Sequence, residues 1–399
     1  MKRNIVITII SAAAVLLVFC LFRFLMDKKE RTDRVLKVGI IYEGDESTPY
    51  TNNFIHTQQA IESQFGDKVV FVVKNNVPEE AATDVLNELV EEKCELIFAN
   101  SYGYAGEMKK IAGEHPDIQF CQATGDNAAE TPFYENYHTF MGEIYQGRYV
   151  TGVVAGMKLK ELIDSGEISK EEAKIGYVAA YSCAEVVSGY TAFLLGVRSV
   201  VDSAVMTVKY TNTWGNYYQE KVCAQELIEE GCVVISQHSD TIGPAVACEE
   251  NRASKTVFHV GYNQSMIDVA PTTSLISSKI NWTPYMSAAV EAVLTGKDID
   301  QYVKGNKHKN DVGGGLEEDW VQILELNSII AADGTDEKID EVIRDIKRGD
   351  CEVFKGNYIG VNPEDESDTC DLSEGYKENK DSSAPTFFYI LKDVITIEQ

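Results

Sequence analysis

The chain has 399 residues, which is too long for one ordinary domain and suits two. Hydrophobic residues make up 44% and charged residues 25%, so the sequence can build buried cores and is not a disordered tail. Lys and Arg total 36 against 63 Asp and Glu, and the net charge of −27 disfavours nucleic-acid partners and attachment to anionic lipid through a basic patch.

The N-terminal segment has the pattern of a membrane anchor. Two basic residues precede an uncharged, mostly apolar run over residues 4–22, and about 19 such residues are enough to cross a bilayer. We expect residues 1–33 to form an anchor and linker, with one transmembrane helix over residues 4–26 and the body on the extracytoplasmic face of the cell membrane. Cys20 leaves open a second interpretation, a lipoprotein, although the two residues before it are not small.

After the anchor, apolar runs alternate with amphipathic segments. The predicted strands include residues 35–42, 69–73, 96–99, 118–121, 175–180, 205–210, 233–236 and 257–260. Residues 56–65, 78–92 and 218–230 are predicted helices of this series. Strands that alternate with helices of 10–15 residues predict parallel sheets with right-handed crossovers.

The body contains a duplication. Residues 87–101 reappear in similar form as residues 225–239, and residues 37–42 match residues 174–179 at almost the same spacing. We therefore predict two similar α/β lobes. The expected boundaries are 34–141 for the first lobe, with roughly 283–350 returning to it, 142–282 for the second, and 351–399 for C-terminal strands and an acidic loop.

The last part of the chain changes character. Residues 334–348 predict a charged helix, and residues 354–360 and 386–396 predict strands around an acidic surface loop at 362–383. The nine Cys include no CxxC pair and the six His are scattered, so we expect no metal site and no cofactor. Whether the eight Cys of the body form disulfides is left open.

Ligands of open parallel sheets bind at the carboxyl ends of the strands, so the loops after each strand hold the candidate site. These loops combine aromatic rings with Asn, Asp and His, a mixture that suits a flat, polar, neutral ligand whose faces are stacked and whose edges are hydrogen-bonded. The candidate ligand-binding residues are Tyr50, Asn53, Phe54, Tyr102 and Asp126 in the first lobe, followed by Tyr181, Asn212, Trp214, His238, Asp240, Asn263 and Trp282.

Six stretches of the body resemble one protein family. They are residues 37–42, 117–125, 147–156, 212–214, 237–240 and 260–263. As a set they resemble the basic membrane protein (Bmp) family of extracytoplasmic substrate-binding proteins, which includes purine nucleoside receptors serving ABC transporters. The resemblance implies a type I periplasmic-binding fold, with two doubly wound lobes and a hinge. It also implies an ABC transporter permease as partner and a purine held between one aromatic ring from each lobe.

The resemblance assigns roles to some of the candidates. Trp214 falls at the position of the second-lobe stacking ring. Asn53 falls where nucleoside receptors have the first-lobe ring, so Phe54, Tyr50 or Tyr102 would supply that ring here. Asn263 replaces an Asp expected to take ribose hydroxyls, and the His-Ser-Asp stretch at 238–240 is similar to the branch that binds free bases. The expected ligand is a purine base or a nucleoside, without a choice between them.

Catalysis is the competing class of function. The sequence has no Gly-x-Ser-x-Gly, no Walker loop and no His-Glu-x-x-His, and no nucleophile accompanies the His and Asp at 238–240. We therefore expect a binding protein and not an enzyme, with a nucleoside hydrolase as the alternative. A membrane-anchored sensor that binds the ligand without delivering it to a transporter is a further alternative.

Overall fold

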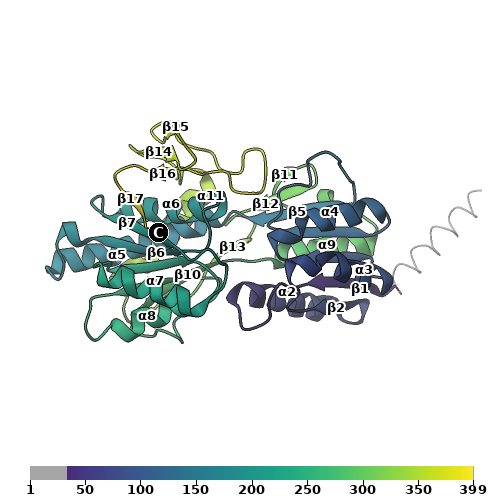
Figure 1. The fold of residues 1–399 in the computed structure, drawn as a ribbon, viewed down its shortest axis with the longest axis horizontal. Coiled ribbons are helices and arrows are strands. Elements are labelled where there is room, and N and C mark those ends of the chain that lie inside the picture. Colours follow the sequence, from purple (N-terminus) through teal and green to yellow (C-terminus); the bar gives the residue numbers. More distant parts are fainter. Residues whose placement is uncertain (1–33, 399) are drawn as a thin grey trace, which may run out of the picture.

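The structure is a computed structural model that describes residues 34–398, and the helix predicted over residues 4–26 lies outside this range. Within residues 34–398, no helix combines the length and apolar character needed to span a bilayer. Figure 1 shows two α/β lobes placed end to end along the long axis of the molecule. We call the lobe that begins at residue 34 the first lobe and the other the second lobe.

The first lobe is built around a seven-stranded sheet. Its core strands are β1 (Leu36–Ile41), β2 (Val69–Lys74), β3 (Leu96–Ala99), β4 (Gln119–Ala123) and β5 (Tyr137–Gly142), all parallel and in the order β5-β4-β3-β1-β2. At the β5 edge, β12 (Asp311–Gly314) pairs in parallel and β11 (Asn306–His308) pairs antiparallel to β12. Alternate side chains enter opposite cores: Val38 and Ile40 pack with one helix layer and Ile41 with the other.

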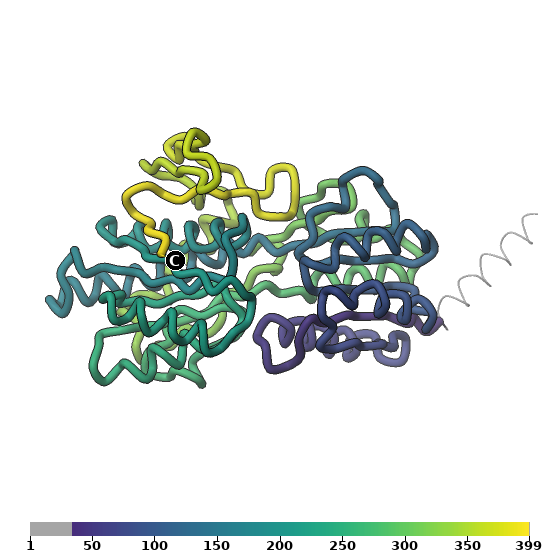
Figure 2. Tube along the Cα trace, in the orientation of Figure 1, coloured from purple at the N-terminus to yellow at the C-terminus, as the bar shows by residue number. Residues whose placement is uncertain are grey.

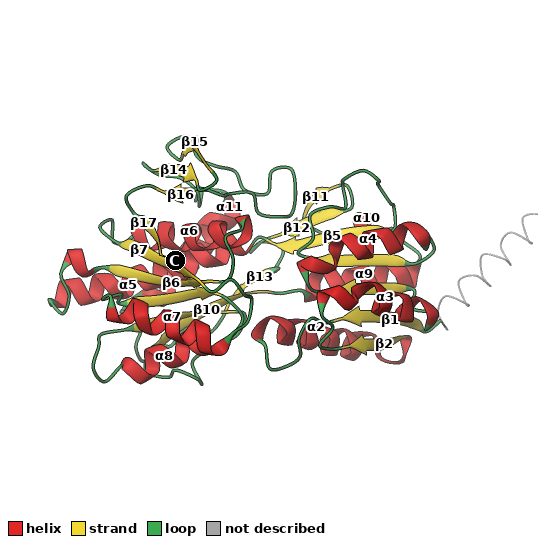
Figure 3. Cartoon of the chain, viewed as in Figure 1, coloured by secondary structure: helices red, strands yellow, loops and turns green. Residues whose placement is uncertain are grey.

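Helices cover both faces of this sheet (Figure 3). One layer holds α2 (Pro49–Phe65) and α9 (Thr283–Thr295), and the other holds α3 (Ala82–Glu91) and α4 (Ala105–Glu114). The short α10 (Ile299–Tyr302) follows α9. Single-turn 3₁₀ helices occur at Gly66–Lys68, Glu79–Ala81, Tyr102–Tyr104 and Lys170–Glu172.

The second lobe repeats the arrangement. Its parallel strands are β6 (Lys174–Ala179), β7 (Val205–Tyr210), β8 (Val234–His238), β9 (Phe258–Tyr262) and β10 (Ser274–Ile280), in the order β10-β9-β8-β6-β7. The edges are β13 (Val321–Ile323), antiparallel to β10, and β17 (Ile395–Glu398), parallel to β7. Helices α5 (Ile144–Ser165) and α6 (Ala184–Arg198) cover one face, and α7 (Tyr217–Glu229) and α8 (Gly243–Asn251) cover the other.

The predicted duplication is confirmed by the strand order. The matching segments 37–42 and 174–179 fall in β1 and β6, and each of these strands lies between the next two strands of its own sheet. Both sheets therefore have the 2-1-3-4-5 order of a doubly wound fold, with a topological switch point beside the first strand of each lobe. Ligand sites of such sheets lie at that point, outside the carboxyl ends of the strands.

The segment that returns to the first lobe is shorter than predicted. The sequence predicts that roughly residues 283–350 belong to the first lobe, but β13 pairs with β10 of the second sheet. Helix α11 (Thr335–Arg348) packs against α5, because its apolar side chains, including Ile339 and Ile346, face the cores while its charged residues face solvent. The last strand that this return adds to the first sheet is therefore β12.

The C-terminal segment also differs from its prediction. A small antiparallel sheet is formed by β14 (Ile359–Asn362), β15 (Asp365–Asp371) and β16 (Ile390–Leu391). The acidic stretch 362–383, predicted as a loop, thus contains a strand. Backbone pairing with β14 stabilises β15 although most of its side chains remain exposed, so its apolar content gives no signal.

The α5–α6 interface depends on two glycines. A Cβ at Gly152 would lie 2.1 Å from the carbonyl oxygen of Phe193, and a Cβ at Gly196 would lie 2.2 Å from that of Tyr149. These distances are far below van der Waals contact, so the two helices approach closely only because both positions lack a side chain. Both helices lie largely inside the second lobe, which makes their contact a major part of its core.

We expect Gly152→Ala to lower the free energy of unfolding by roughly 1–3 kcal/mol, because the added methyl group forces the two backbones apart. Gly106→Ala is the matched control, since Gly106 lies on the exposed face of α4 with no atom within 4 Å of the added Cβ. It should stabilise the helix by about 0.5–1 kcal/mol. Urea unfolding followed by circular dichroism measures both, and equal midpoints for the two variants would contradict the role of Gly152.

Candidate functional site

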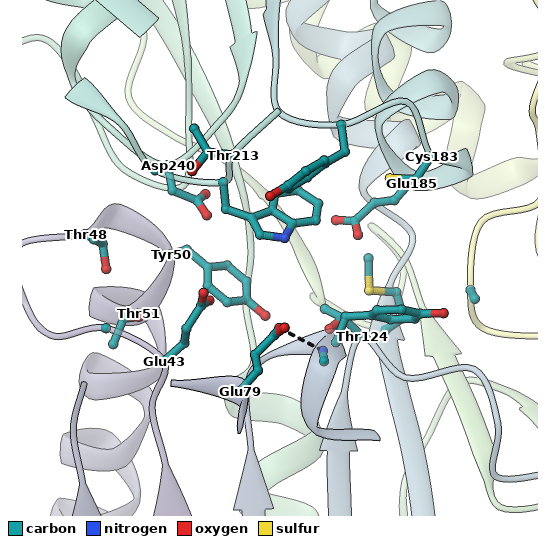
Figure 4. Close-up of a pocket in the computed structure, with 18 of the residues that line it drawn as sticks. Glu43, Thr48, Tyr50, Thr51, Glu79, Thr124, Cys183, Glu185, Thr213 and Asp240 are labelled. Carbon is teal, nitrogen blue, oxygen red and sulfur yellow. Dashed lines mark hydrogen bonds between the residues drawn. The ribbon is translucent and has the colours of Figure 1, made fainter. Parts of the chain in front are cut away.

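A cleft of about 670 Å³ lies where the carboxyl ends of the two sheets face each other. Its wall from the first lobe includes Glu43, Thr48, Tyr50, Thr51, Glu79, Tyr102, Thr124 and Asp126. Its wall from the second lobe includes Tyr181, Cys183, Glu185, Thr213, Trp214 and Asp240, and the C-terminal segment adds Ala384 and Pro385. A deeper recess is lined in addition by Asn100, His238 and Tyr262. Figure 4 shows Glu43 and Tyr50 extending from one lobe toward Asp240 and Glu185 of the other.

Aromatic rings from both lobes line this cleft. Trp214 follows β7 and makes an edge contact with Tyr181, with ring centres 5.3 Å apart. The Trp214 carbonyl accepts a hydrogen bond of 2.8 Å from the backbone N–H of Asp240, which fixes the loop that carries the ring. Tyr50 and Tyr102 line the opposite wall. The cleft can therefore hold a planar ligand between rings of different lobes.

Two predicted ligand residues belong instead to the core of the first lobe. Phe54 and Trp282 are 1% exposed, and their rings stack on each other with centres 4.5 Å apart. The reason is that α2 begins at Pro49, so the stretch expected as a loop already has helical periodicity and Phe54 faces inward. Both rings contact Tyr50 edge-on, and the Tyr50 hydroxyl donates to the Asn100 carbonyl, so the pair positions a cleft residue from behind.

A polar contact joins the facing walls. Asn263 follows β9 and is 2% exposed. Its side-chain amide donates to Asp240 Oδ1 at 3.3 Å, and its Oδ1 accepts a bond of 3.4 Å from Asn53 of the first lobe. Asn53 is thus a lobe-to-lobe contact on α2 and does not line the cleft. The backbone of Asn263 is in the left-handed region, which Asn tolerates better than most residues.

Asn212 does not take part in the cleft. Its side chain is exposed and outside the lining, although its neighbours Thr213 and Trp214 line the wall. Its positive φ of 54° lies at the start of a bend over residues 212–214, immediately after β7. The side chain of Asn212, two positions before Trp214, is exposed to solvent at this bend.

Carboxylates dominate the polar lining. Glu43, Glu79, Asp126, Glu185 and Asp240 all line the cleft, whereas no Lys or Arg among the described residues does. Burial, followed by repulsion from Glu220, Glu43 and Glu185, raises the pKa of Asp240 well above its usual value. Burial also raises the pKa of Glu43 and Asp126, with repulsion from other carboxylates in both cases. The site is thus built for ligands that donate hydrogen bonds or carry positive charge, and it disfavours anions.

A buried cation lies beneath the recess. Arg148 of α5 is fully buried, with its guanidinium carbon 3.7 Å from the centre of the Tyr262 ring and Nη1 donating to the Gln237 carbonyl at 2.8 Å. Burial and the Arg148 charge lower the pKa of His238, whose Nε2 lies 3.4 Å from a Glu185 oxygen. His238 is therefore a neutral imidazole near pH 7, available as a hydrogen-bonding group rather than as a charge.

Sequence reasoning missed Glu43, Glu79, Glu185 and Arg148. The three carboxylates follow β1, β2 and β6, so the same rule that selected Tyr50 and Asp126 could have found them. Glu79 also shapes the wall, because it accepts a hydrogen bond of 2.7 Å from Ser101 Oγ. It accepts a second one of 3.1 Å from the Gly103 N–H, the dashed line at Glu79 in Figure 4. Arg148 had a weaker signal, a single cation in the first turns of a mostly apolar helix.

Within residues 34–398 the structure contains neither a cluster of metal ligands nor a disulfide. No group of three or more His, Cys, Asp or Glu side chains within residues 34–398 has the geometry to hold a metal ion. The eight Cys of this range are unpaired thiols, and burial raises the pKa of Cys183, which lines the cleft, to about 11. A thiol of that kind is protonated near pH 7 and is a poor nucleophile.

Comparisons with known proteins agree with this geometry. The Bmp family model, described as ABC transporter substrate-binding protein PnrA-like, matches residues 36–349. A purine-binding protein of Brucella abortus is 28% identical over 84% of this chain and 87% of its own length. A protein of Haloferax volcanii, provisionally named as a glucose-binding protein of an ABC transporter, is 32% identical over 53% of this chain and 49% of its own.

The fold is also found among solved structures. A solute-binding protein of an ABC transporter system from Aeropyrum pernix superposes with a TM-score of 0.63 at 16% identity, covering 83% of this chain and 95% of its own. The two parallel sheets and two lobes thus form a periplasmic-binding-protein-like α/β fold. At this level of identity the likeness concerns the fold alone.

We expect the ligand-free protein to become more stable as the pH is lowered from 8 to about 6.5. A carboxyl group with a raised pKa keeps its proton in the folded state at pH values where the unfolded chain has lost it, so stability falls as the pH rises through that window. Burial raises the pKa of Glu143 to about 7, and Asp240 acts in the same direction. Below about 6.5, His238 and His259, whose pKa values burial lowers, act in the opposite direction.

Asp240→Asn is the informative variant for this pH dependence. It should be more stable than the parent at pH 8 and lose that advantage toward pH 6, as measured by urea unfolding at each pH. A stability difference that is constant over this range would show that Asp240 is ionised throughout.

Proposed function

The chain belongs to the Bmp family of ABC transporter substrate-binding proteins, and from this premise we propose that it binds a purine base or purine nucleoside in the cleft between its lobes. The single observation that carries the proposal is the combination of Trp214 with an acceptor-rich lining. A purine offers two flat faces for stacking and N–H groups along its edge. Carboxylate and carbonyl oxygens are the natural partners of those N–H groups.

The carboxylates narrow the class of ligand further. Asp240, Glu185 and Glu43 surround the space beside Trp214 without a Lys or Arg in the described lining. A phosphate group placed there would meet negative charge from both lobes in a partly dehydrated cleft, which is unfavourable. The ligand is therefore a neutral base or nucleoside and not a nucleotide. Neutral His238 can donate to a ring nitrogen that lacks hydrogen.

Similarity to relatives supports binding and transport rather than catalysis. Members of the family bind substrates for ABC transporters, so the chain is a binding protein, as its sequence predicts, and nucleoside hydrolysis is discarded. The purine-binding relative from Brucella covers most of the chain and supports a purine ligand. The provisional glucose-binding name of the relative from Haloferax makes glucose the competitor that a binding test has to include.

The N-terminal segment completes the proposal. Residues 4–26 serve as an uncleaved transmembrane anchor that holds the body on the extracytoplasmic face of the cell membrane, where it delivers the ligand to the permease of an ABC transporter. The support is the uncharged apolar run over residues 4–22, with basic residues before it.

A thermal-shift and calorimetry screen of the purified protein tests the ligand class. Adenine, guanine, adenosine, guanosine and inosine should include at least one ligand that raises the melting temperature, because binding to the folded state alone stabilises it. The corresponding 5′-monophosphates should bind at least about 100-fold more weakly, because each places a dianion among the carboxylates. Stabilisation by glucose and by no purine would refute the proposed ligand.

Trp214→Ala tests the site. Loss of stacking and of burial together should weaken purine binding by roughly 2–4 kcal/mol, or about 30- to 1000-fold. The fold should survive, because Trp214 faces the cleft and is only partly buried. Tyr218→Ala is the matched control, since that ring is 79% exposed on α7 and does not line the cleft, so its removal should leave affinity unchanged. Equal affinities for both variants would place the ligand elsewhere.

Mass spectrometry of the protein extracted from membranes tests the anchor. The expected mass is that of the full-length chain, with residues 4–26 retained. A diacylated Cys20 as the first residue would show a lipoprotein instead, and protease treatment of intact cells should digest the body if it lies outside the membrane.

A further inference from the structure

The C-terminal segment returns to the cleft after the region that the family model matches. That region ends at residue 349, whereas Ala384 and Pro385 line the cleft. The yellow segment in Figure 2 runs from the second lobe, over the space between the lobes, toward the first lobe. We name residues 378–387 the bridging loop. Both of its ends lie on the second lobe and its tip reaches the first.

The base of the bridging loop is closed and buried on the second lobe. The Glu378 carboxylate accepts backbone hydrogen bonds from Thr386 at 2.7 Å and from Phe387 at 3.0 Å, which ties the two ends of the loop together. Phe387 is fully buried and stacks on Phe354 with ring centres 4.6 Å apart. After the loop, β17 pairs with β7 in the second sheet. This attachment to the second lobe is largely apolar and includes backbone pairing. We therefore expect it to persist when the lobes move apart.

The tip of the bridging loop is held to the first lobe by polar contacts. Asp311 of β12 is 1% exposed, and its Oδ2 accepts the backbone N–H of Ser383 at 2.6 Å and the Ser382 hydroxyl at 3.2 Å. The Ser383 hydroxyl donates to the other oxygen of Asp311. Asn306 of β11 donates to the Asn379 carbonyl at 2.9 Å. One buried carboxylate therefore carries most of the attachment to the first lobe.

From these contacts we propose that the bridging loop is a brace between the lobes and a side wall of the ligand site. Ala384 and Pro385 close the flank of the cleft directly beside the residues that fasten the loop to Asp311. Opening the lobes pulls Ser383 away from Asp311 and withdraws this wall. The contact with Asp311 therefore opposes opening, and it slows ligand release more than ligand capture.

The bridging loop connects the lobes in addition to the three backbone crossings that form the hinge. The backbone crosses between the lobes after β5, after β10 and between β12 and β13. These crossings determine the direction in which the lobes open and close, but they do not determine how far the lobes open. The bridging loop adds a fourth connection whose polar end can detach and whose apolar end cannot. Charge-assisted hydrogen bonds to a buried carboxylate are strong enough to shift an equilibrium between open and closed lobes by about an order of magnitude or more.

Asp311→Asn in the full-length protein tests the brace, because the amide keeps the size of the side chain and removes the charge that holds Ser383. Three readouts follow: hydrogen–deuterium exchange of residues 378–387, the radius of gyration of the ligand-free protein by X-ray scattering, and ligand dissociation by stopped-flow Trp214 fluorescence. Exchange should quicken and the radius should rise. Dissociation of a purine probe, adenine or guanosine, should quicken about 5- to 30-fold, with association changed by less than about 3-fold.

Thr139→Val is the matched control. Thr139 of β5 donates to the same carboxylate at 2.8 Å from within the first lobe, so its loss leaves the contact with the bridging loop in place and should leave all three readouts unchanged. Ser382→Ala combined with Ser383→Ala is the second variant, which removes two hydroxyl donors without altering β12. It should show the same changes as Asp311→Asn at smaller amplitude.

The outcomes separate this proposal from the proposed function. The dissociation measurement rests on purine binding, whereas exchange and scattering do not. If no purine binds the parent protein, the function fails and the other two readouts still decide the brace. Unchanged exchange and radius in both sets of variants would overturn it, and so would faster exchange of the loop with an unchanged radius and unchanged dissociation.

Discussion

The carboxyl ends of parallel strands meet at one edge of a sheet, and this constraint organises the whole molecule. Each lobe repeats the 2-1-3-4-5 strand order, so each presents the loops after its strands on the side that faces the other lobe. Trp214 follows β7, Asp240 follows β8 and Glu43 follows β1, and the chain separates them widely although they share one cleft. Most residues that line the cleft lie in loops after the strands, and the strands hold these loops at fixed positions.

Bringing the two edges together places like charges opposite each other. Repulsion from Glu43 of the first lobe and from Glu185 of the second adds to burial in raising the pKa of Asp240. Arg148 offsets part of this charge from beneath the recess, but its Nε and Nη2 have no hydrogen-bond partner among the described residues. The ligand-free cleft is therefore electrostatically unfavourable when closed. A ligand with several N–H donors relieves that repulsion, which couples closure of the lobes to the chemistry of the ligand.

The sequence was sufficient for the two-lobe topology because apolar runs and a repeated pattern are local signals, but burial depends on tertiary partners. Strand β5 was missed because His138 and Thr139 interrupt its apolar pattern, and both are satisfied only by distant partners: His138 Nδ1 lies 2.9 Å from Asp300, and Thr139 donates to Asp311. For the site, the position of a residue directly after a strand correctly predicts that it lies at the carboxyl edge of the sheet. It does not predict whether its side chain points into the cleft or into the core. Phe54 and Trp282 therefore went to the core, while Tyr50 lines the cleft.

Burial in the bridging loop also could not be predicted from local sequence, here because polar residues are buried. Its sequence is polar and acidic around residues 378–383, which is the composition of a solvated loop, yet Glu378, Asn379 and Ser383 are each at most 5% exposed. Buried polar groups are costly unless they are paired, so this burial requires partners that local sequence does not reveal. The loop itself supplies partners for Glu378 and Asn379, whereas Asp311 supplies those of Ser383 from the other lobe. The charges in the cleft favour separation of the lobes. The polar contact between Asp311 and Ser383 opposes that separation and breaks when the lobes open, so it sets the balance between the closed and open states. A purely apolar contact would instead hold the lobes in one arrangement.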